Sequence, residues 1–274
     1  MSQYRVTLNL ELTSKCNAKC VMCPREAITN RQIMSLDTLS QCLSRFNVKD
    51  LYRVVVAGYG EPTTHPKFEA CLRLLAQTPV RVDLVSNGQL LDRDRLLLMD
   101  SVLSNLIISF SSVDPAIYSQ VHVNLDQQRV MANIIEAQRT LRSTNLAISL
   151  TPLRCCLDTL PQTIEWLRAN GVENLTMSPT LYDRAGSMQE SSREEANLRD
   201  IIQHYGLHSQ ELDFVPSLRE VYAQWRRNKV KCIPRNAGLV IAADGSYQYC
   251  FNDMSHSHPL GHVAEMSVRE ALEV

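Results

Sequence analysis

The sequence predicts an α/β protein whose parallel sheet forms an open or partial barrel. Short β-rich runs alternate with helical patterns from the N-terminus onward, which is typical of βα units and a parallel sheet. Six strand–helix units can be recognised, fewer than the eight of a closed barrel. A hairpin pattern near the C-terminus predicts a small additional β-module.

The expected elements follow one another in regular order. The expected strands are Val6–Leu12, Arg53–Ala57, Arg81–Val85, Asn105–Phe110, Leu146–Thr151 and Asn174–Met177. The expected helices are Leu36–Phe46, Phe68–Gln77, Arg93–Ser101, Arg129–Arg142, Leu160–Ala169 and Ser192–Tyr205. Asn170-Gly171 is a favourable C-cap for the helix that precedes it.

The pattern changes after about residue 206. Prolines interrupt the alternation of strands and helices. Further on, Gly238–Ala242 and Tyr247–Phe251 flank an Asp244-Gly245 turn. Two short strands around such a turn predict a β-hairpin. We therefore expect a barrel domain over residues 1–206 and a C-terminal module over residues 207–274.

Composition narrows the possible functions and the compartment. A net charge of −1 gives no general attraction to nucleic acid or to an anionic membrane. No apolar run approaches the roughly 20 residues that span a bilayer, and the N-terminus lacks a signal-peptide pattern. We expect a cytoplasmic protein with neither nucleic acid nor membrane as a partner.

The chain contains nine cysteines, which in a reducing compartment indicate metal binding or catalysis rather than disulfides. Cys42 and Cys71 lie in helical patterns and are expected to be small buried hydrophobes. Cys16, Cys20 and Cys23 instead form a C-x3-C-x2-C cluster directly after the first strand. An iron–sulfur cluster or zinc site normally has four protein ligands, so three thiolates leave one metal position open for a reacting molecule.

Other distinctive loops leave neighbouring strands at the same edge. Gly58-Tyr59-Gly60-Glu61-Pro62 follows the second strand, Ser86-Asn87-Gly88 the third, and residues 109–114 the fourth. In parallel βα architectures ligands bind at the carboxyl ends of the strands. These loops could therefore hold a small polar cofactor beside the open metal position.

The order C-x3-C-x2-C, then G-x-G-E-P, then S-N-G resembles the radical S-adenosylmethionine (radical SAM) superfamily over Val6 to Pro179. The resemblance implies a partial (β/α)6 TIM-like barrel. It also implies a [4Fe-4S] cluster held by Cys16, Cys20 and Cys23, with SAM on the fourth iron. Reductive cleavage of SAM would then give a 5′-deoxyadenosyl radical that abstracts hydrogen from a substrate. An external electron donor of the flavodoxin or ferredoxin type would supply the electron.

Cofactor contacts are carried over by position. The positions that the resemblance places at SAM are Met22, Tyr59, Gly60, Glu61, Pro62, Ser86, Asn87, Ser109 and Ser111. Related enzymes often have Tyr-x-x-x-Arg after the fourth strand, where this chain has Tyr118-Ser-Gln-Val-His122. A histidine lacks the fixed fork of an arginine. His122 is therefore expected to bind SAM, to face the substrate, or to do neither.

The C-terminal region resembles the start of a SPASM or twitch module, which carries an auxiliary cluster. Cys232 and Cys250 lie eighteen positions apart around the hairpin, and Leu260-Gly261-His262-Val263 follows. Three interpretations stay open: a cluster completed by Cys155, Cys156, His256, His258 or His262, a module that has lost its cluster, or a truncated chain. Two cysteines alone hold a cluster poorly, which favours the second.

The leading functional hypothesis is hydrogen abstraction from a small sugar-like or aminocyclitol-like metabolite, leading to oxidation or epimerisation. Because the chain starts close to the first strand, a leader-peptide recognition domain is not expected. A peptide maturase of the same superfamily is the alternative. Cys155, Cys156 and His122 are candidate catalytic residues, the thiols as hydrogen donors. A non-catalytic iron–sulfur electron carrier or metal-binding protein is the alternative of another class.

Overall fold

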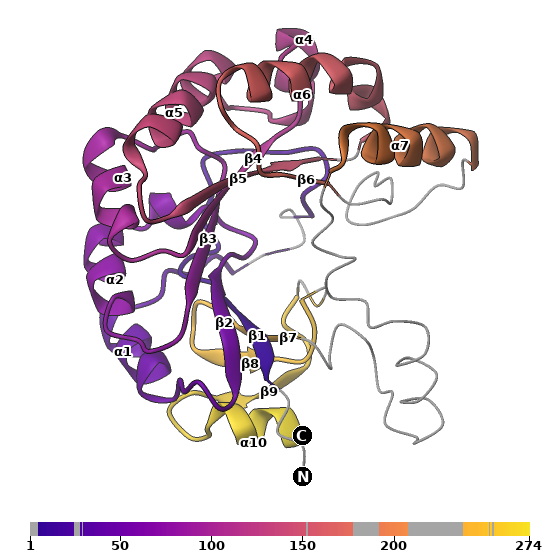
Figure 1. Ribbon diagram of the computed structural model, residues 1–274. Helices are drawn as coiled ribbons and strands as arrows, with labels where there is room; N and C mark the ends of the chain where they lie inside the picture. The colour runs from indigo at the N-terminus through magenta and orange to yellow at the C-terminus, as the bar shows by residue number, and fades with distance from the viewer. Residues whose placement is uncertain are drawn as a thin grey trace. The chain divides into compact units, whose positions relative to one another are not determined.

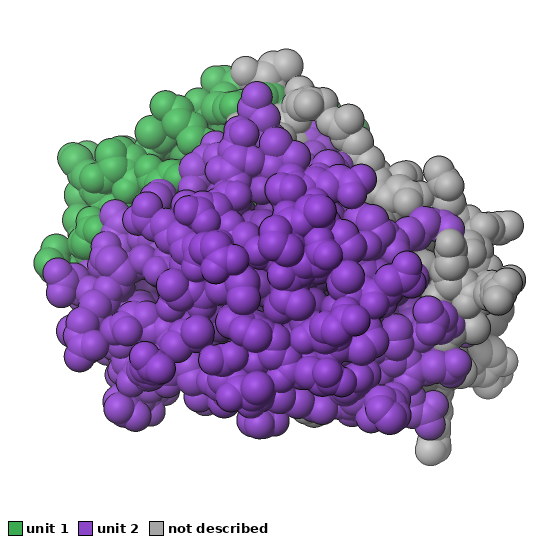
Figure 2. Space-filling model, turned by 90° about the horizontal axis from the view of Figure 1, so that it is seen from above, with its two compact units in different colours: residues 1–15, 27–83, 211–274 green, residues 16–26, 84–210 purple. Residues whose placement is uncertain are grey.

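The computed structural model describes residues 5–24, 28, 30–151, 153–177, 192–207, 238–251, 253 and 255–274. Its contacts group the chain into two compact units, coloured separately in Figure 2. Unit 1 comprises Met1–Lys15, Ala27–Asp83 and Glu211–Val274, and unit 2 comprises Cys16–Glu26 and Leu84–Gln210. Among the described residues, no helix is both long enough and apolar enough to cross a membrane.

Unit 1 is built on a mixed sheet (Figure 1). Its own strands are β1 (Val6–Leu10), β2 (Leu51–Val56), β7 (Gly238–Ile241), β8 (Ser246–Gln248) and β9 (Pro259–His262), in the order β2-β1-β7-β8-β9. β1 pairs in parallel with both β2 and β7, whereas β7, β8 and β9 pair antiparallel. The predicted hairpin is therefore confirmed, and it extends the sheet that contains β1.

The helices of unit 1 start where capping residues allow. They are α1 (Leu36–Ser44), the 3-10 helix η2 (Pro62–Thr64), α2 (Phe68–Leu75) and α10 (Val268–Glu273). Ser35 caps α1 by accepting a hydrogen bond from the Thr38 amide, and Ser267 forms a capping box with Glu270. Cys42 and Cys71 are fully buried on α1 and α2, which confirms that they belong to the core.

Unit 2 carries the later parallel strands. β3 (Val82–Ser86) enters it from Leu84 onward, and β4 (Asn105–Phe110), β5 (Asn145–Leu150) and β6 (Leu175–Met177) follow in the order β6-β5-β4-β3. Its helices are α3 (Arg93–Asp100), α4 (Pro115–Val121), α5 (Gln127–Thr140), the 3-10 helix η3 (Arg154–Thr159), α6 (Leu160–Ala169) and α7 (Ser192–Tyr205). β4 and β5 pair in register, Asn105 opposite Asn145.

The predicted fold class is confirmed: the protein is α/β with a parallel sheet, and the described strands do not close into a barrel. The predicted elements differ from the observed ones mainly at their ends. The helix expected from Arg129 begins at Gln127 because the Asp126 side chain caps it. The short helix α4 was not predicted, although Asp114 caps it and Pro115 starts it. The expected domain boundary at residue 206 stays a prediction.

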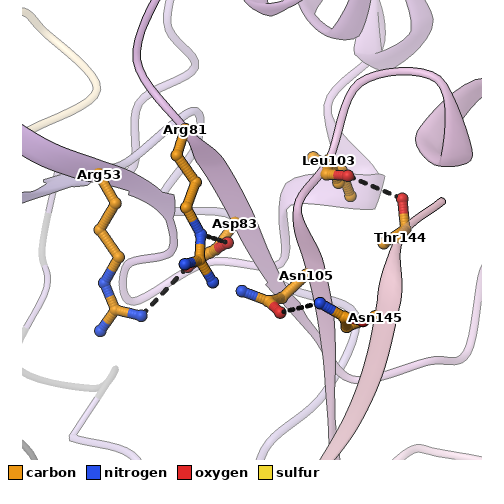
Figure 3. A network of polar contacts seen from close by, with 7 residues as sticks. All are labelled: Arg53, Arg81, Asp83, Leu103, Asn105, Thr144 and Asn145. Atoms are coloured by element: carbon orange, nitrogen blue, oxygen red, sulfur yellow. Dashed lines mark hydrogen bonds and ion pairs between the residues drawn. The ribbon is translucent and has the colours of Figure 1, made fainter. Parts of the chain in front are cut away.

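Side-chain hydrogen bonds hold the amino ends of neighbouring strands (Figure 3). In unit 1 the fully buried Asp83 carboxylate accepts from Arg53 Nη1 at 3.1 Å and from Arg81 Nε at 3.3 Å. In unit 2 Thr144 Oγ1 donates to the Leu103 carbonyl at 2.8 Å, and Asn145 Nδ2 donates to Asn105 Oδ1 at 3.3 Å. These bonds fix the strand starts opposite to the edge where the functional loops emerge.

Asp83→Ala should lower the free energy of unfolding by about 3 kcal/mol, because removing one partner of a buried ion pair leaves the other charge poorly compensated. Urea denaturation of the purified variant measures this loss. Asp94→Ala removes an exposed carboxylate from the first turn of α3 and serves as the matched control. A loss at Asp83 no larger than the roughly 0.5 kcal/mol of a surface change would show that the pair contributes little.

Candidate functional site

The cysteine loop lies in unit 2 and is held by backbone hydrogen bonds. The Lys19 amide donates to the Val123 carbonyl at 2.8 Å, and the Val21 amide donates to the Val121 carbonyl at 3.0 Å. These two bonds attach the loop to the turn that follows α4. The sequence motif is therefore fixed against a structural element about 100 residues further along the chain.

The three thiols present a suitable donor set for an iron–sulfur cluster. Cys16, Cys20 and Cys23 are half-buried and not in disulfides, and the Cys23 amide donates to the Cys20 carbonyl, which folds the loop back on itself. In the described part of the chain, no three Cys, His, Asp or Glu side chains are grouped closely enough for a single metal ion. A cubane cluster binds each thiolate on a separate iron and so needs them further apart. Three half-buried thiols on one loop are a donor set that suits a cluster with one iron left open.

His122 lies against one of the predicted cluster ligands. Its Nδ1 is 3.3 Å from Cys20 Sγ, and its ring centre is 4.8 Å from that of Tyr118. Tyr118 and His122 are four residues apart at the end of α4, so they share one face. Burial lowers the pKa of His122 to about 4, and within the described part of the chain its Nε2 has no hydrogen-bond partner. The structure therefore brings a neutral imidazole to the cysteine loop.

The adjacent cysteines Cys155 and Cys156 have different environments. They lie on η3, where Cys155 is exposed while Cys156 is fully buried. Cys156 forms a small apolar cluster with Val121 and Leu153, against which Met22 packs. Burial raises the pKa of the Cys156 thiol, so this residue is a neutral, apolar neighbour of the cysteine loop.

Asn87 connects the loop after β3 with the cysteine loop. Its Nδ2 donates to Asn17 Oδ1 at 2.8 Å, and its own Oδ1 accepts from the Gln89 amide. Ser86 and Ser111 are buried, and Ser109 is half-buried on β4 opposite Ser149. The structure thus brings Asn87 to the loop that holds the thiols, and the predicted SAM contacts of the serines stay predictions.

The Gly-Tyr-Gly-Glu-Pro loop lies in unit 1, after β2. Gly60 passes so close to the backbone after β1 that a Cβ there would lie 2.0 Å from the Thr13 carbonyl oxygen. The Glu61 amide donates to the Lys15 carbonyl at 2.9 Å. The Glu61 carboxylate is buried and caps η2, which begins at Pro62, by accepting from the Thr63 amide at 3.1 Å and the Thr63 hydroxyl at 2.6 Å. The close approach of Gly60 to the Thr13 carbonyl oxygen means that only glycine fits at position 60.

Sequence reasoning missed Glu11, a buried carboxylate at the carboxyl end of β1. Its Oε2 accepts from the Tyr59 amide at 2.8 Å, whereas its Oε1 has no hydrogen-bond partner among the described residues. Burial raises its pKa, and the Tyr59 amide, the charge of His256 and the Ala243 amide partly oppose that shift. An acidic residue inside the apolar run that ends at Leu12 was the available signal.

The C-terminal candidates that the structure describes make separate contacts, and the predicted auxiliary cluster stays a prediction. Cys250 is half-buried and belongs to no metal-binding group of three side chains within the described residues, and Cys232 lies outside those residues. His262 Nε2 donates to the Asp244 carbonyl while its Nδ1 accepts from the Ala264 amide. His258 Nδ1 lies 3.4 Å from Asp253 Oδ2. His256 lines a small cavity together with Glu11 and Cys250.

Comparison with known families identifies the first half of the chain. The model of the Radical SAM superfamily matches residues 10–152. A probable GTP 3′,8-cyclase of Methanococcus maripaludis is 23% identical over 183 residues, covering 64% of this chain and 61% of the relative. The GTP 3′,8-cyclase of Pseudomonas putida is 32% identical over 137 residues, covering 48% of this chain and 41% of the relative. The chain therefore matches less than two thirds of the length of either relative.

Solved structures with a similar fold share little sequence. The crystal structure of Streptococcus suis SuiB bound to precursor peptide SuiA has a TM-score of 0.73 at 12% identity, covering 97% of this chain and 64% of that one. The structure of anSMEcpe with bound AdoMet has a TM-score of 0.72 at 15% identity, covering 99% and 81%. At these identities the similarity establishes the fold alone.

Asn87→Ala should make the amide hydrogens of Lys19 and Val21 exchange about five times faster, because one hydrogen bond worth about 1 kcal/mol no longer holds the loop. Hydrogen exchange followed by NMR measures this in the protein without cofactors. Asn105→Ala is the matched control, since it removes an equivalent bond to Asn145. Equal exchange in wild type and the Asn87 variant would show that Asn87 does not hold the loop.

Proposed function

Because this chain belongs to the radical SAM superfamily, we propose that it is an enzyme that removes a hydrogen atom from a carbon of a small polar metabolite. Members of the superfamily use SAM and a [4Fe-4S] cluster. When bound and reduced by an external one-electron donor, these groups supply a 5′-deoxyadenosyl radical, which takes up the hydrogen atom and leaves as 5′-deoxyadenosine. The substrate radical would then lose one proton and pass one electron to a one-electron acceptor, which completes an oxidation, or take up a hydrogen atom from a thiol, which completes an epimerisation.

The observation that carries this proposal is the arrangement around the cysteine loop of unit 2. Cys16, Cys20 and Cys23 would hold the cluster on a loop fixed by two backbone hydrogen bonds. The neutral His122 would donate from Nδ1 to Cys20 Sγ, at the 3.3 Å separation described above. Hydrogen bonds to the sulfur ligands are one of the means by which a protein sets the reduction potential of a cluster.

The remaining residues would orient SAM and exclude water. Asn87 is positioned by Asn17, and Met22 with its apolar neighbours Leu153 and Cys156 covers one side of the loop. A dry, preorganised surrounding protects a reactive radical from side reactions and holds the substrate carbon close to it. The resemblance assigns the SAM amino group to the Gly-Tyr-Gly-Glu-Pro motif, which contains Glu61.

Two observations support a small substrate. Relatives of this chain are named as cyclases of GTP, a small polar molecule, and the chain matches 61% of the length of one of them. The buried Glu11 also offers a site for a polar group in unit 1. The peptide alternative has support of its own, because SuiB was solved with a precursor peptide bound.

Anaerobic reconstitution with iron and sulfide, followed by SAM and a strong reductant, should produce 5′-deoxyadenosine. Cys23→Ser should abolish that product, because a cluster ligand is lost, while the core variant Cys42→Ala should retain it. Iron analysis should give about four irons per chain for one cubane cluster and about eight for two. Failure of the wild-type protein to bind SAM or to form 5′-deoxyadenosine would reject the enzyme.

The substrate class can be tested with a deuterium label. A metabolite extract from cells grown in deuterated medium is divided into small-molecule and peptide fractions, and each is added to the reconstituted enzyme. The small-molecule fraction should transfer deuterium to 5′-deoxyadenosine, which mass spectrometry measures. The reason is that this fraction contains the substrate whose carbon-bound deuterium is abstracted. Label from the peptide fraction alone would favour a peptide maturase, and label from neither would contradict hydrogen abstraction.

A further inference from the structure

Unit 1 contains a small cavity at the carboxyl ends of its central strands. Residues that follow β1, β2 and β7 line it, together with the segment after β8: Glu11, Gly58, Tyr59, Val240, Ala242, Gln248, Cys250, Phe251, Asp253 and His256. The cavity is too small for a whole metabolite and has room for one polar group. Tyr59 and Phe251 form one wall as stacked rings, with centroids 5.4 Å apart and planes 22° from parallel.

The buried carboxylate of Glu11 is the distinctive group of this cavity. Glu11 is only 4% exposed, and its Oε2 is already used by the Tyr59 amide at 2.8 Å. Among the described residues, no donor lies within hydrogen-bond geometry of its Oε1, and the nearby Ala243 amide lowers the pKa of the carboxyl. A buried charged oxygen without a partner costs free energy that a hydrogen-bond donor would recover.

The local structure accommodates this carboxylate specifically. A Cβ at Gly58 would lie 2.5 Å from Glu11 Oε2 and 2.8 Å from Glu11 Cβ, so glycine at 58 leaves the space that the glutamate fills. His256 has a left-handed backbone (φ 51°), and its amide donates a hydrogen bond to the Asp253 carbonyl. Such backbone conformations persist only where the surroundings enforce them, and they concentrate at functional sites.

The charge in the cavity favours a cation over an anion. Two carboxylates line it, and that of Asp253 is already used by the Ser257 and His258 amides. His256 is the one basic residue among the described residues that line it, and its charge also acts on Glu11. A group with both positive charge and N–H donors fits Glu11 Oε1 better than a neutral or anionic group.

We propose that this cavity is a binding subsite for a primary ammonium group, with Glu11 Oε1 as its acceptor and the stacked Tyr59 and Phe251 rings beside it. The substrate class would then be an amine-bearing small metabolite. This assignment rests on the proposed function, since it names the substrate of that enzyme. Burial raises the pKa of Glu11, and a bound ammonium would favour the ionised carboxylate again.

The subsite can be tested by NMR titration of the full chain with methylammonium at pH 8, without cluster, SAM or reductant. The Tyr59 amide, which donates to Glu11, should shift in a saturable manner. Tetramethylammonium carries the same charge without an N–H donor, so it should produce no saturable shift. Glu11→Gln should weaken methylammonium binding at least 10-fold, the loss of a charged hydrogen bond, whereas the exposed Glu173→Gln should leave it unchanged.

Gly58→Ala provides a second variant in which the carboxylate is kept but displaced, and it should weaken binding in the same way. Equal binding by wild type and Glu11→Gln, equal response to both cations, or no saturable shift in wild type would overturn the subsite. Because the titration needs neither cluster nor SAM, its outcome is independent of 5′-deoxyadenosine formation. A protein that cleaves SAM but does not bind methylammonium would retain its proposed function and lose the proposed subsite.

Discussion

The position of β1 between two parallel neighbours is the constraint on which unit 1 depends. Because β1 pairs with β2 on one side and β7 on the other, the segments that follow all three strands emerge at one edge. Glu11 lies at that edge, and the backbone at Thr13 leaves no space for a side chain on Gly60. The Lys15 carbonyl then accepts the Glu61 amide. The shape of the Gly-Tyr-Gly-Glu-Pro loop is therefore set by the strand it faces.

The segment after β1 contributes residues to two chemically different environments. Glu11 and its cavity use oxygen atoms and charge, which suit a polar group of a substrate. The loop that begins at Cys16 uses sulfur and lies beside a neutral imidazole and an apolar cluster, which suits a metal cluster whose potential depends on burial and hydrogen bonding. Only a few residues of chain separate Glu11 from the first cysteine, so a short segment contributes to both.

Local signals made the strands, most helices and the cysteine loop predictable. The spacing of Cys16, Cys20 and Cys23, and the loop around Gly60, are contained within a few residues each. The contacts of His122 with Cys20 and of Asn87 with Asn17 join residues far apart in the sequence, and no local pattern specifies them. The orientation of Cys155 and Cys156 was also not predictable, because it depends on a 3-10 helix that no local pattern indicated. Glu11 was missed because its cavity is completed by residues near 250.

The C-terminal hairpin has a structural role that does not depend on a metal. β7 pairs in parallel with β1, and β8 returns antiparallel beside it, so the chain after β8 reaches the carboxyl edge of β1. Phe251 stacks on Tyr59, and the Tyr59 hydroxyl donates to the Phe251 carbonyl. Asp253 accepts the Ser257 and His258 amides and so fixes the turn that carries His256. A C-terminal module that kept these contacts without a cluster would still form one wall of the Glu11 cavity. The structural role of this hairpin therefore does not require a cluster.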